Sequence, residues 1–209
     1  MLPELEDANQ YINSKISIID NRILEMEKYA IENNIPIITR EVAEYLKFML
    51  NIHKSKNVLE IGTAIGYSGS IICESIKVNN GMLTTIEINK ETYEISRNNF
   101  EKNNITNVKS YLGDAVDVLD NLNDSYDFIF IDASKGQYHM FFEKSFKLLE
   151  KDGIIFIDNI LFRGYLYKEN YPKRYKTIVN KLNKFIEYLY SNHNFVLLPF
   201  GDGIGLVKK

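Results

Sequence analysis

The order of hydrophobic and polar positions divides the chain into a helical beginning and a longer region of alternating elements. Apolar residues recur three or four positions apart, with the period of an amphipathic helix, at Ile16, Ile19, Ile23 and Met26. The pattern breaks at residues 33–36, Asn-Asn-Ile-Pro, and a second helical pattern follows. Thr39 is the expected N-cap of that helix, because a threonine hydroxyl accepts a hydrogen bond from a free backbone N–H. Residues 1–52 are therefore predicted to be mainly helical.

Seven short apolar runs of strand length follow the helical region. They are Val58–Ile61, Leu83–Ile86, Val108–Leu112, Phe128–Ile131, Ile154–Ile157, Phe195–Leu198 and Ile204–Val207. Stretches long enough for a crossover helix separate the first five runs, which indicates an α/β fold with a largely parallel, doubly wound sheet. Only residues 199–203 separate the last two runs. These two are expected to form a hairpin that places one antiparallel strand at the end of the sheet.

Composition agrees with an ordinary globular protein. The chain has 209 residues, 45% of them hydrophobic, which fits one domain spanning residues 1–209. No apolar run reaches the length of a membrane span, and the acidic residues Glu4, Glu6 and Asp7 oppose a secretory signal. The single cysteine, Cys73, lies in a helix-like apolar pattern and is expected in the core. We therefore expect a cytoplasmic protein.

A glycine-rich turn follows the first predicted strand, at the sheet edge where ligands of such folds bind. Residues 60–69 read EIGTAIGYSG, with Gly62 and Gly66 spaced as G-x-x-x-G and acidic Glu60 before them. Dinucleotide-binding enzymes carry G-x-G-x-x-G instead, which seats a pyrophosphate on a helix N-terminus. A carboxylate is a poor neighbour for a pyrophosphate and a good one for the ammonium group of S-adenosylmethionine. The turn therefore favours the latter ligand.

The second and third predicted strands end in residues suited to adenosine. Glu87 lies roughly 20 to 25 residues beyond the glycine turn, where a carboxylate can accept hydrogen bonds from both ribose hydroxyls. Gly113, Asp114 and Ala115 form a turn placed to contact an adenine edge. Taken singly, Glu87 is also explained as a helix cap, and the glycines as turn residues. Their occurrence at successive strand ends favours a cofactor site.

Oxygen-bearing side chains end the fourth and fifth predicted strands. Asp132 ends the fourth, and Asp158 and Asn159 end the fifth. Because neighbouring parallel strands lie about 4.8 Å apart, the three side chains can converge. Two carboxylates and an amide suit Mg²⁺, or another divalent cation such as Mn²⁺, better than zinc. Lys135 can reach the same region and is the candidate general base, whereas His139 is expected to be a surface or packing residue.

A basic segment stands out against the formal net charge of −3. Residues 163–184 contain seven basic residues and one acidic residue, Glu169, so the segment carries +6 and the remainder −9. Such a patch is typical of contact with a local anionic partner. Charge alone explains it equally well as a solvated helix face.

The motifs EIGTAIGYSG (60–69), IDASK (131–135) and IDN (157–159) together resemble the metal-dependent class I O-methyltransferases, which include catechol and caffeoyl-CoA O-methyltransferases. The resemblance runs from about Pro36 to the end of the chain and implies a Rossmann-like seven-stranded sheet whose last strand is antiparallel. It implies that Lys135 is the general base, and that the metal ligands are Asp132, Asp158 and Asn159. The residues implied for the S-adenosylmethionine site are Ile38, Glu60, Gly62, Ser68, Glu87, Gly113, Asp114, Ala115 and Asp132.

Within that family the chain is most similar to bacterial enzymes that methylate 5-hydroxyuridine to 5-methoxyuridine at the wobble position of the tRNA anticodon. The similar stretches are DNILFRG (158–164), PKR (172–174) and GDG (201–203). The resemblance implies a tRNA partner, phosphate contacts from Arg163, Lys173 and Arg174, and tyrosines that stack on unpaired bases. Since relatives are often dimers, it also implies a homodimer, with a lid and a dimer contact in residues 1–52.

Three other functions are compatible with parts of the pattern. The first is methylation of a catechol-like or caffeoyl-CoA-like small molecule, with the basic segment guarding the pocket or binding an acidic tail. The second is a nicotinamide-dependent dehydrogenase, which the spacing of Gly62 and Gly66 opposes. The third is a non-catalytic adenosine-binding module. The combination of Asp132, Lys135, Asp158 and Asn159 opposes that reading.

Overall fold

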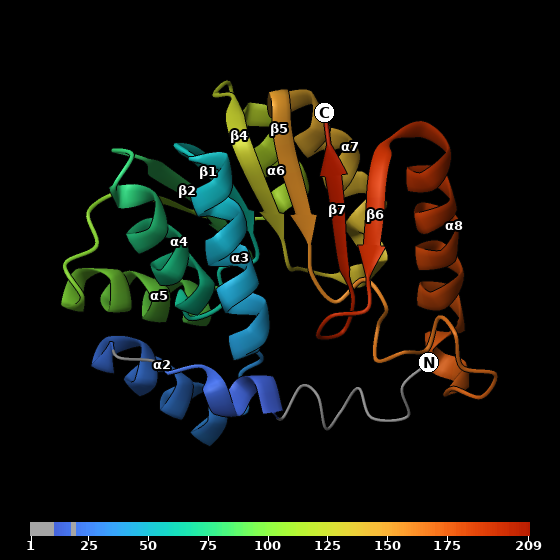
Figure 1. Cartoon of the computed structure of the whole chain (residues 1–209), viewed down its shortest axis with the longest axis horizontal. Coiled ribbons are helices and arrows are strands. Elements are labelled where there is room, and N and C mark those ends of the chain that lie inside the picture. The colour runs from blue at the N-terminus through green and yellow to red at the C-terminus, as the bar shows by residue number, and fades with distance from the viewer. Residues whose placement is uncertain (1–10, 18–19) are drawn as a thin grey trace.

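A seven-stranded sheet forms the centre of the computed structural model, which describes residues 11–17 and 20–209. The strand order is β3-β2-β1-β4-β5-β7-β6 (Figure 1). The strands are β1 (Asn57–Ile61), β2 (Met82–Glu87), β3 (Val108–Leu112), β4 (Tyr126–Ile131), β5 (Leu149–Ile157), β6 (Asn194–Leu198) and β7 (Ile204–Lys208). Every apolar run singled out in the sequence lies within one of these strands. The predicted Rossmann-like α/β fold is confirmed.

The predicted antiparallel hairpin of β6 and β7 is present and forms one end of the sheet. β7 pairs antiparallel with both β5 and β6, and it runs upward in Figure 1 where β5 and β6 run downward. The antiparallel strand therefore lies one position inside the edge, and β6 is the edge strand. The crossover through α8 places β6 one strand position beyond the neighbour of β5. The tight turn after β6 then returns the chain, so that β7 lies between β5 and β6.

Alternating side chains on the central strands build two separate cores. Phe128, Phe130 and Phe156 belong to the core on one face, whereas Ile129 and Ile131 belong to the core on the other. The first face is covered by α2 (Asn21–Glu32), α3 (Arg40–His53), α4 (Tyr67–Lys77) and α5 (Lys90–Lys102). The second is covered by α6 (Ala115–Asn121), α7 (Tyr138–Leu148) and α8 (Lys176–Asn192). Short 3₁₀ turns η1 (Lys135–Gln137) and η2 (Lys173–Tyr175) precede α7 and α8.

The N-terminal helical region is broken rather than continuous. Residues 11–15 are helical, and α2 begins only at Asn21, because the Asp20 carboxylate accepts a hydrogen bond from the backbone N–H of Arg22 and caps the helix there. Ile16 thus lies outside a helix, contrary to the prediction. Thr39 is the N-cap of α3, as predicted, although its side chain makes no capping bond. Ile19, Glu4, Glu6 and Asp7 lie outside the described residues, as does the rest of 1–10 in the predicted lid and dimer region.

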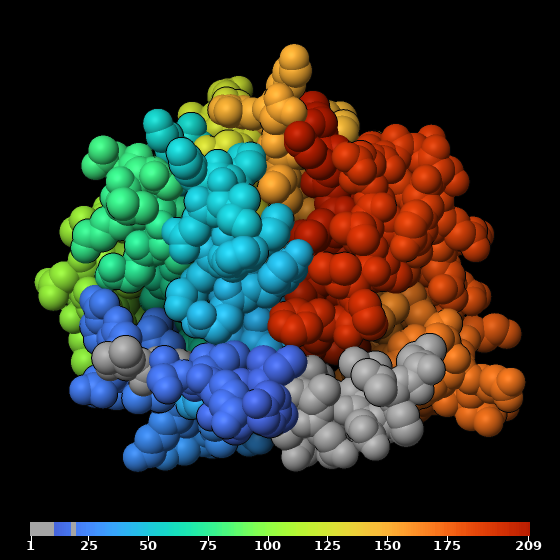
Figure 2. Space-filling model, viewed as in Figure 1, coloured from blue at the N-terminus to red at the C-terminus, as the bar shows by residue number. Residues whose placement is uncertain are grey.

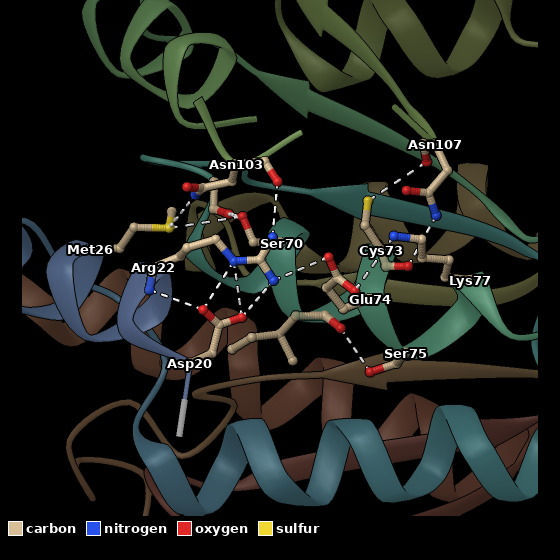
Figure 3. A network of polar contacts seen from close by, with 12 residues as sticks. Asp20, Arg22, Met26, Ser70, Cys73, Glu74, Ser75, Lys77, Asn103 and Asn107 are labelled. Atoms are coloured by element: carbon tan, nitrogen blue, oxygen red, sulfur yellow. Dashed lines mark hydrogen bonds and ion pairs between the residues drawn. The ribbon is translucent and has the colours of Figure 1, made fainter. Parts of the chain in front are cut away.

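Arg22 anchors α2 to the body of the molecule. Its guanidinium group donates to Asp20 at 2.6 Å, to Glu74 of α4 at 3.3 Å and to the carbonyl oxygen of Asn103 at 2.9 Å (Figure 3). Cys73 lies nearby on α4 and is buried, as predicted for a core residue, and burial raises the pKa of its thiol. These contacts hold the N-terminal helix against α4 and α5.

A second polar cluster ties α2, α3 and α4 together beside the glycine turn. The buried carboxylate of Glu27 accepts hydrogen bonds from Arg40 at 2.7 Å and from the hydroxyl group of Tyr67 at 2.7 Å. Tyr67 begins α4 directly after the turn, so the N-terminal helices are fixed relative to the carboxyl end of β1. In the part of the chain that the structure describes, no helix is both long enough and apolar enough to traverse a bilayer.

Candidate active site

A cavity of about 360 Å³ opens at the carboxyl ends of β1, β2, β3 and β4. Its volume is within the range of ordinary small-molecule sites. Two residues predicted for the chemistry, Lys135 and Asn159, line it together with most of the predicted cofactor residues. Those cofactor residues are Ile38, Gly62, Ser68, Glu87, Gly113, Asp114, Ala115 and Asp132. The structure therefore joins the predicted cofactor end and metal end in one cavity.

Gly62 allows the ends of β1 and β4 to approach each other. It has φ +100°, and a Cβ atom at this position would lie 2.0 Å from the carbonyl oxygen of Asp132. No larger residue fits without moving the backbone that carries the predicted metal ligand. The glycine turn then ends at Gly66, also left-handed, which caps α4. The turn thus fixes both the cofactor loop and Asp132.

Glu60 is the one predicted cofactor residue that does not line the cavity, because its carboxylate is fully buried. It accepts hydrogen bonds from the hydroxyl groups of Ser68 and Thr85, each at 2.5 Å. Thr63 lies 2.5 Å from Thr85 and extends this network to the cavity. Glu60 therefore supports the Ser68 and Thr63 side chains, which do line the cavity.

Burial raises the pKa of Glu60 to about 7, against the opposing effect of the Ser68 and Thr85 hydrogen bonds. As pH rises from 4.5 through 7, the unfolded chain ionises first and the free energy of unfolding falls, by about 3 kcal/mol in total. Glu60→Gln removes this penalty. We expect the ligand-free variant to gain about 3 kcal/mol relative to the wild type between pH 5 and pH 8, measured by urea unfolding.

The exposed Glu101→Gln on α5 is the matched control for this prediction, because the same chemical change there removes no buried charge. It should leave the pH dependence of unfolding as in the wild type. If Glu60→Gln and the wild type lose the same stability between pH 5 and pH 8, the carboxylate of Glu60 is ionised without cost and the assignment is wrong.

Glu87 and Asp114 stand at the predicted adenosine end. One oxygen of the Glu87 carboxylate accepts from the N–H of Ala64 at 2.7 Å, and the other accepts from the N–H of Asn89 at 2.8 Å. Asn89, rather than Glu87, is the N-cap of α5, so the helix-cap explanation of Glu87 does not hold. Asp114 caps α6 through the N–H of Val116. Both carboxylates line the cavity and keep lone pairs free for a ligand.

Several cavity residues were not predicted from the sequence. Ile88 follows Glu87 directly and is an exposed apolar residue, which is a signal that sequence reading could have used. Gln137 and Phe141 belong to η1 and α7, and their contribution depends on how α7 packs. The other unpredicted lining residues are Pro36, Ile37, Ile61, Thr63, Ala64, Tyr67, Ile86, Ala133 and Ser134.

Lys135 contacts two of the three predicted metal ligands, Asp132 and Asn159. Its Nζ atom lies 3.2 Å from Oδ1 of Asp132 and 2.9 Å from Oδ1 of Asn159. A positive charge is thus already stabilised where two of the three predicted ligand oxygens meet. Asp158 is buried beside them, with one carboxylate oxygen accepting from the N–H of Asn159 at 2.7 Å. Burial and the charge of Asp132 raise the pKa of Asp158, while the N–H of Asn159 and the charge of Lys135 oppose the rise.

This donor set fits a hard divalent cation. Among residues 11–17 and 20–209, no group of three or more His, Cys, Asp or Glu side chains could hold a metal ion. The predicted set contains two carboxylates, and the amide of Asn159 supplies the third ligand, which is compatible with Mg²⁺. His139 is not part of it, since its ring packs against Phe185 and Tyr188 with centroid distances of 5.3 and 4.6 Å, as expected for a packing residue.

The basic segment contains an aromatic cluster that the charge pattern did not reveal. The rings of Tyr165 and Tyr175 stack with centroids 5.4 Å apart, and both contact Phe162. Tyr171 lies against Tyr165, so only Tyr167 among the four tyrosines is largely exposed. Of the four tyrosines predicted to stack on bases, one ring is therefore largely exposed, and the other three pack against neighbouring rings. Its cations Arg163, Lys173 and Arg174 are exposed.

Comparisons with known proteins agree with this site. Residues 14–209 match the model of the O-methyltransferase family. Caffeoyl-CoA O-methyltransferase 2 of Petunia hybrida is 30% identical over 189 residues, which cover 84% of this chain and 77% of that protein. Caffeoyl-CoA O-methyltransferase 5 of Nicotiana tabacum is 29% identical over 190 residues, covering 84% and 78%. The SAH-bound crystal structure of the Podospora anserina methyltransferase PaMTH1 superposes with a TM-score of 0.87 at 25% identity, covering 99% and 96% of the two chains.

The chain therefore belongs to the O-methyltransferase family. Its enzyme class is that of the class I O-methyltransferases that use S-adenosylmethionine, as the sequence resemblance implied. The two plant relatives are named for caffeoyl-CoA, so similarity to the tRNA-modifying branch is not shown by these comparisons.

Proposed function

We propose that this protein transfers the methyl group of S-adenosylmethionine to one oxygen of an acceptor with two adjacent oxygens, using Mg²⁺ or a similar divalent cation. The observation that carries the proposal is the position of Lys135 Nζ, which bridges Asp132 and Asn159 at one end of the cofactor cavity. A candidate general base and two candidate metal ligands thus lie together in the cavity proposed for the methyl donor.

The cavity residues suit the parts of S-adenosylmethionine. Glu87 has free carboxylate lone pairs for the ribose hydroxyls, and Ile88 and Phe141 offer apolar surface for the adenine ring. Ser68, held by Glu60, lies toward the methionine end together with Ile38, which is buried at the lid between α2 and α3. The N-terminal helices would then cover the donor and exclude water from the reacting atoms.

Methyl transfer at this site requires one proton movement. The acceptor hydroxyl loses its proton to Lys135 Nζ in its neutral form, the oxygen forms a bond to the methyl carbon, and the carbon–sulfur bond breaks to leave S-adenosylhomocysteine. When bound by Asp132, Asp158 and Asn159, a divalent cation would lower the pKa of the acceptor hydroxyl and orient its oxygen. The protein's share of the rate then comes mainly from positioning.

A basic groove beside the cavity supports an acceptor with an anionic extension. The groove, of about 450 Å³, shares Lys135 and Gln137 with the cofactor cavity and is also lined by Lys181 and Lys184 of α8, with Glu143 as its acidic residue. The exposed residues 173–174 lie in η2, directly before that helix, and Figure 2 shows this part of the chain, in orange, projecting at the lower right. Cations along a helix beside the site mouth are typical of phosphate contact.

Two acceptors meet these requirements. The first is 5-hydroxyuridine in the anticodon of tRNA, whose adjacent hydroxyl and carbonyl oxygens could chelate the metal and whose phosphates could contact the basic segment. The motifs at residues 158–164, 172–174 and 201–203 favour it. The second is a caffeoyl-CoA-like or catechol-like small molecule, which the names of the plant relatives favour.

Methyl transfer from radiolabelled S-adenosylmethionine, with Mg²⁺ and with a chelator, tests the function. The acceptors are tRNA containing 5-hydroxyuridine, caffeoyl-CoA and a simple catechol. Label that depends on metal in any of them supports the proposed chemistry, and the acceptor with the largest kcat/KM identifies the branch. Transfer that persists unchanged in chelator would contradict the metal assignment.

Reversing the charge of the basic segment should separate the two acceptors. Lys173→Glu with Arg174→Glu is expected to lower kcat/KM for tRNA at least about tenfold, since each lost phosphate contact reduces affinity and the new charges repel the backbone. A simple catechol should be methylated at nearly the wild-type rate. Lys147→Glu with Lys151→Glu, two exposed positions near the end of α7 and the start of β5, makes the same change in net charge and is the control. Equal losses on tRNA and catechol would count against RNA contact here.

A further inference from the structure

The turn between β6 and β7 is locked against the loop that follows β5. The N–H of Ile160 donates to the carbonyl oxygen of Gly203 at 3.0 Å, and the N–H of Leu161 donates to that of Asp202 at 2.9 Å. Gly203 has φ +87°, and a Cβ atom there would lie 2.3 Å from Cγ of Leu161. The two segments are therefore in direct contact immediately after the predicted metal ligand Asn159.

The loop after β5 contains a strained turn. Phe162, Arg163 and Gly164 are consecutive residues with φ values of +48°, +58° and +70°. Residues with a Cβ atom rarely adopt this left-handed backbone conformation, and two of the three, Phe162 and Arg163, have a Cβ atom. The N–H of Tyr165 closes the turn by donating to the carbonyl oxygen of Phe162 at 3.0 Å. Such a turn persists only when surrounding groups support it.

Asp202 supplies that support from the other segment. Its Oδ2 atom accepts from the N–H of Arg163 at 2.6 Å, and the N–H of Gly164 also stabilises the carboxylate. Burial raises the pKa of Asp202, while these N–H groups and the nearby ammonium group of Lys135 oppose the rise. The Asp202 carboxylate thus caps the Arg163 N–H inside the left-handed turn and lies close to the Gly164 N–H.

The turn sets the direction of the basic segment. Phe162, inside the turn, packs edge-to-face against Tyr165 and Tyr175 with centroids 5.5 and 5.2 Å away. Gly164 lies under the Tyr167 ring, where a Cβ atom would come within 2.6 Å of the tyrosine hydroxyl. A change of the turn would therefore move the aromatic cluster together with Arg163.

We propose that Asp202 is a positioning residue for the acceptor, acting through the left-handed turn 162–164. It holds Arg163 and the tyrosine cluster in a fixed relation to Asn159, while it takes no part in binding the methyl donor, whose cavity it does not line. This inference rests on the proposed function, because the acceptor is the one defined there. A purely structural cap of the hairpin would instead lower stability without distinguishing acceptor from donor.

Three variants test the inference. Asp202→Ala removes both acceptor oxygens, whereas Asp202→Asn keeps one oxygen that can accept from Arg163. Asp152→Ala is the control, since it makes the same chemical change near the amino-terminal end of β5, where Asp152 is exposed and pairs with Lys208 away from the cavity. The measurements are kcat and KM for the acceptor, the Kd of S-adenosylmethionine by calorimetry, and amide hydrogen exchange of residues 163–165.

Asp202→Ala is expected to lower kcat/KM for the acceptor about ten- to a hundredfold, the effect of losing hydrogen bonds to a charged group. The Kd of S-adenosylmethionine should change less than about twofold. Asp202→Asn should recover most of the loss, and Asp152→Ala should match the wild type. Exchange at residues 163–165 should accelerate at least about tenfold in Asp202→Ala alone.

Other outcomes would overturn the inference. Unchanged acceptor kinetics in Asp202→Ala would show that the turn does not position the acceptor. Equal weakening of acceptor and donor in both Asp202 variants would show a structural role only. A wild-type enzyme that is inactive on every acceptor would refute the proposed function. Hydrogen exchange needs no substrate, so unchanged exchange in Asp202→Ala would separately refute the stabilisation of turn 162–164 by Asp202.

Discussion

Replacing Asp158 with alanine should reduce metal-dependent methyl transfer by at least about a thousandfold while leaving the Kd of S-adenosylmethionine nearly unchanged. The loss follows from removal of a charged ligand, since metal assistance is worth several kcal/mol and each 1.36 kcal/mol changes a rate tenfold. The donor affinity should persist because Asp158 is buried behind Asn159 and does not line the cofactor cavity. Turnover with Mg²⁺ and calorimetry with S-adenosylmethionine measure the two effects.

The loss should not come from unfolding. Burial and the charge of Asp132 raise the pKa of Asp158, which means that the ionised carboxylate of Asp158 destabilises the ligand-free protein. Its removal therefore relieves the repulsion between Asp158 and Asp132. Asp158→Asn keeps an oxygen that can accept from the N–H of Asn159 and provides a second variant of nearly equal shape. Wild-type turnover in both variants would refute the metal site.

Replacing Lys135 with alanine is expected to slow turnover by roughly a hundred- to ten-thousandfold, the usual contribution of a general base. Lys135→Arg should not restore the rate, because an arginine side chain retains its proton at every accessible pH. Lys147→Ala is the control, since Lys147 is an exposed lysine near the end of α7 that lines neither the cofactor cavity nor the basic groove. Single-turnover kinetics with saturating donor measure the step.

The same Lys135→Ala substitution should not weaken the binding of the metal ion, although it slows turnover. The ammonium group of Lys135 binds Oδ1 of Asp132 and Oδ1 of Asn159, so it competes with a cation for those oxygens. Without it, Mg²⁺ should bind at least as tightly as in the wild type, measured by calorimetry in the presence of S-adenosylmethionine. Slower turnover with weaker metal binding would mean that Lys135 serves the metal site rather than the proton transfer.

Local patterns carried much of the fold. The apolar runs and their spacing predicted all seven strands, and the signal is clearest in central strands such as β4, which is buried on both faces and therefore almost continuously hydrophobic. The paired phenylalanines and isoleucines of β4 then supply two different cores, as the two-residue period of a strand demands. The break before α2 was missed, since the Asp20 cap outweighs the apolar period that runs across it.

The sequence predicted those residues of the candidate site that directly follow a strand. Asp132, Asp158 and Asn159 needed only the parallel arrangement of β4 and β5 to come together, and Lys135 needed only three further residues of chain. The role of Glu60 was not accessible in the same way. Its position before the glycine turn is read from the sequence, but whether its carboxylate points into the cavity or beneath it depends on the partners Ser68 and Thr85.

The sequence by itself determined the class of sheet, the ends of its strands and the donor atoms collected there, because these depend on periodicity and on short stretches of chain. Tertiary structure alone decided which segments distant in sequence meet. Asp202 lies 39 residues from the Arg163 N–H that it caps, and Phe141 reaches the cavity only through the packing of α7. No local pattern encodes such contacts, because they arise when whole helices and hairpins bury their apolar faces against the sheet.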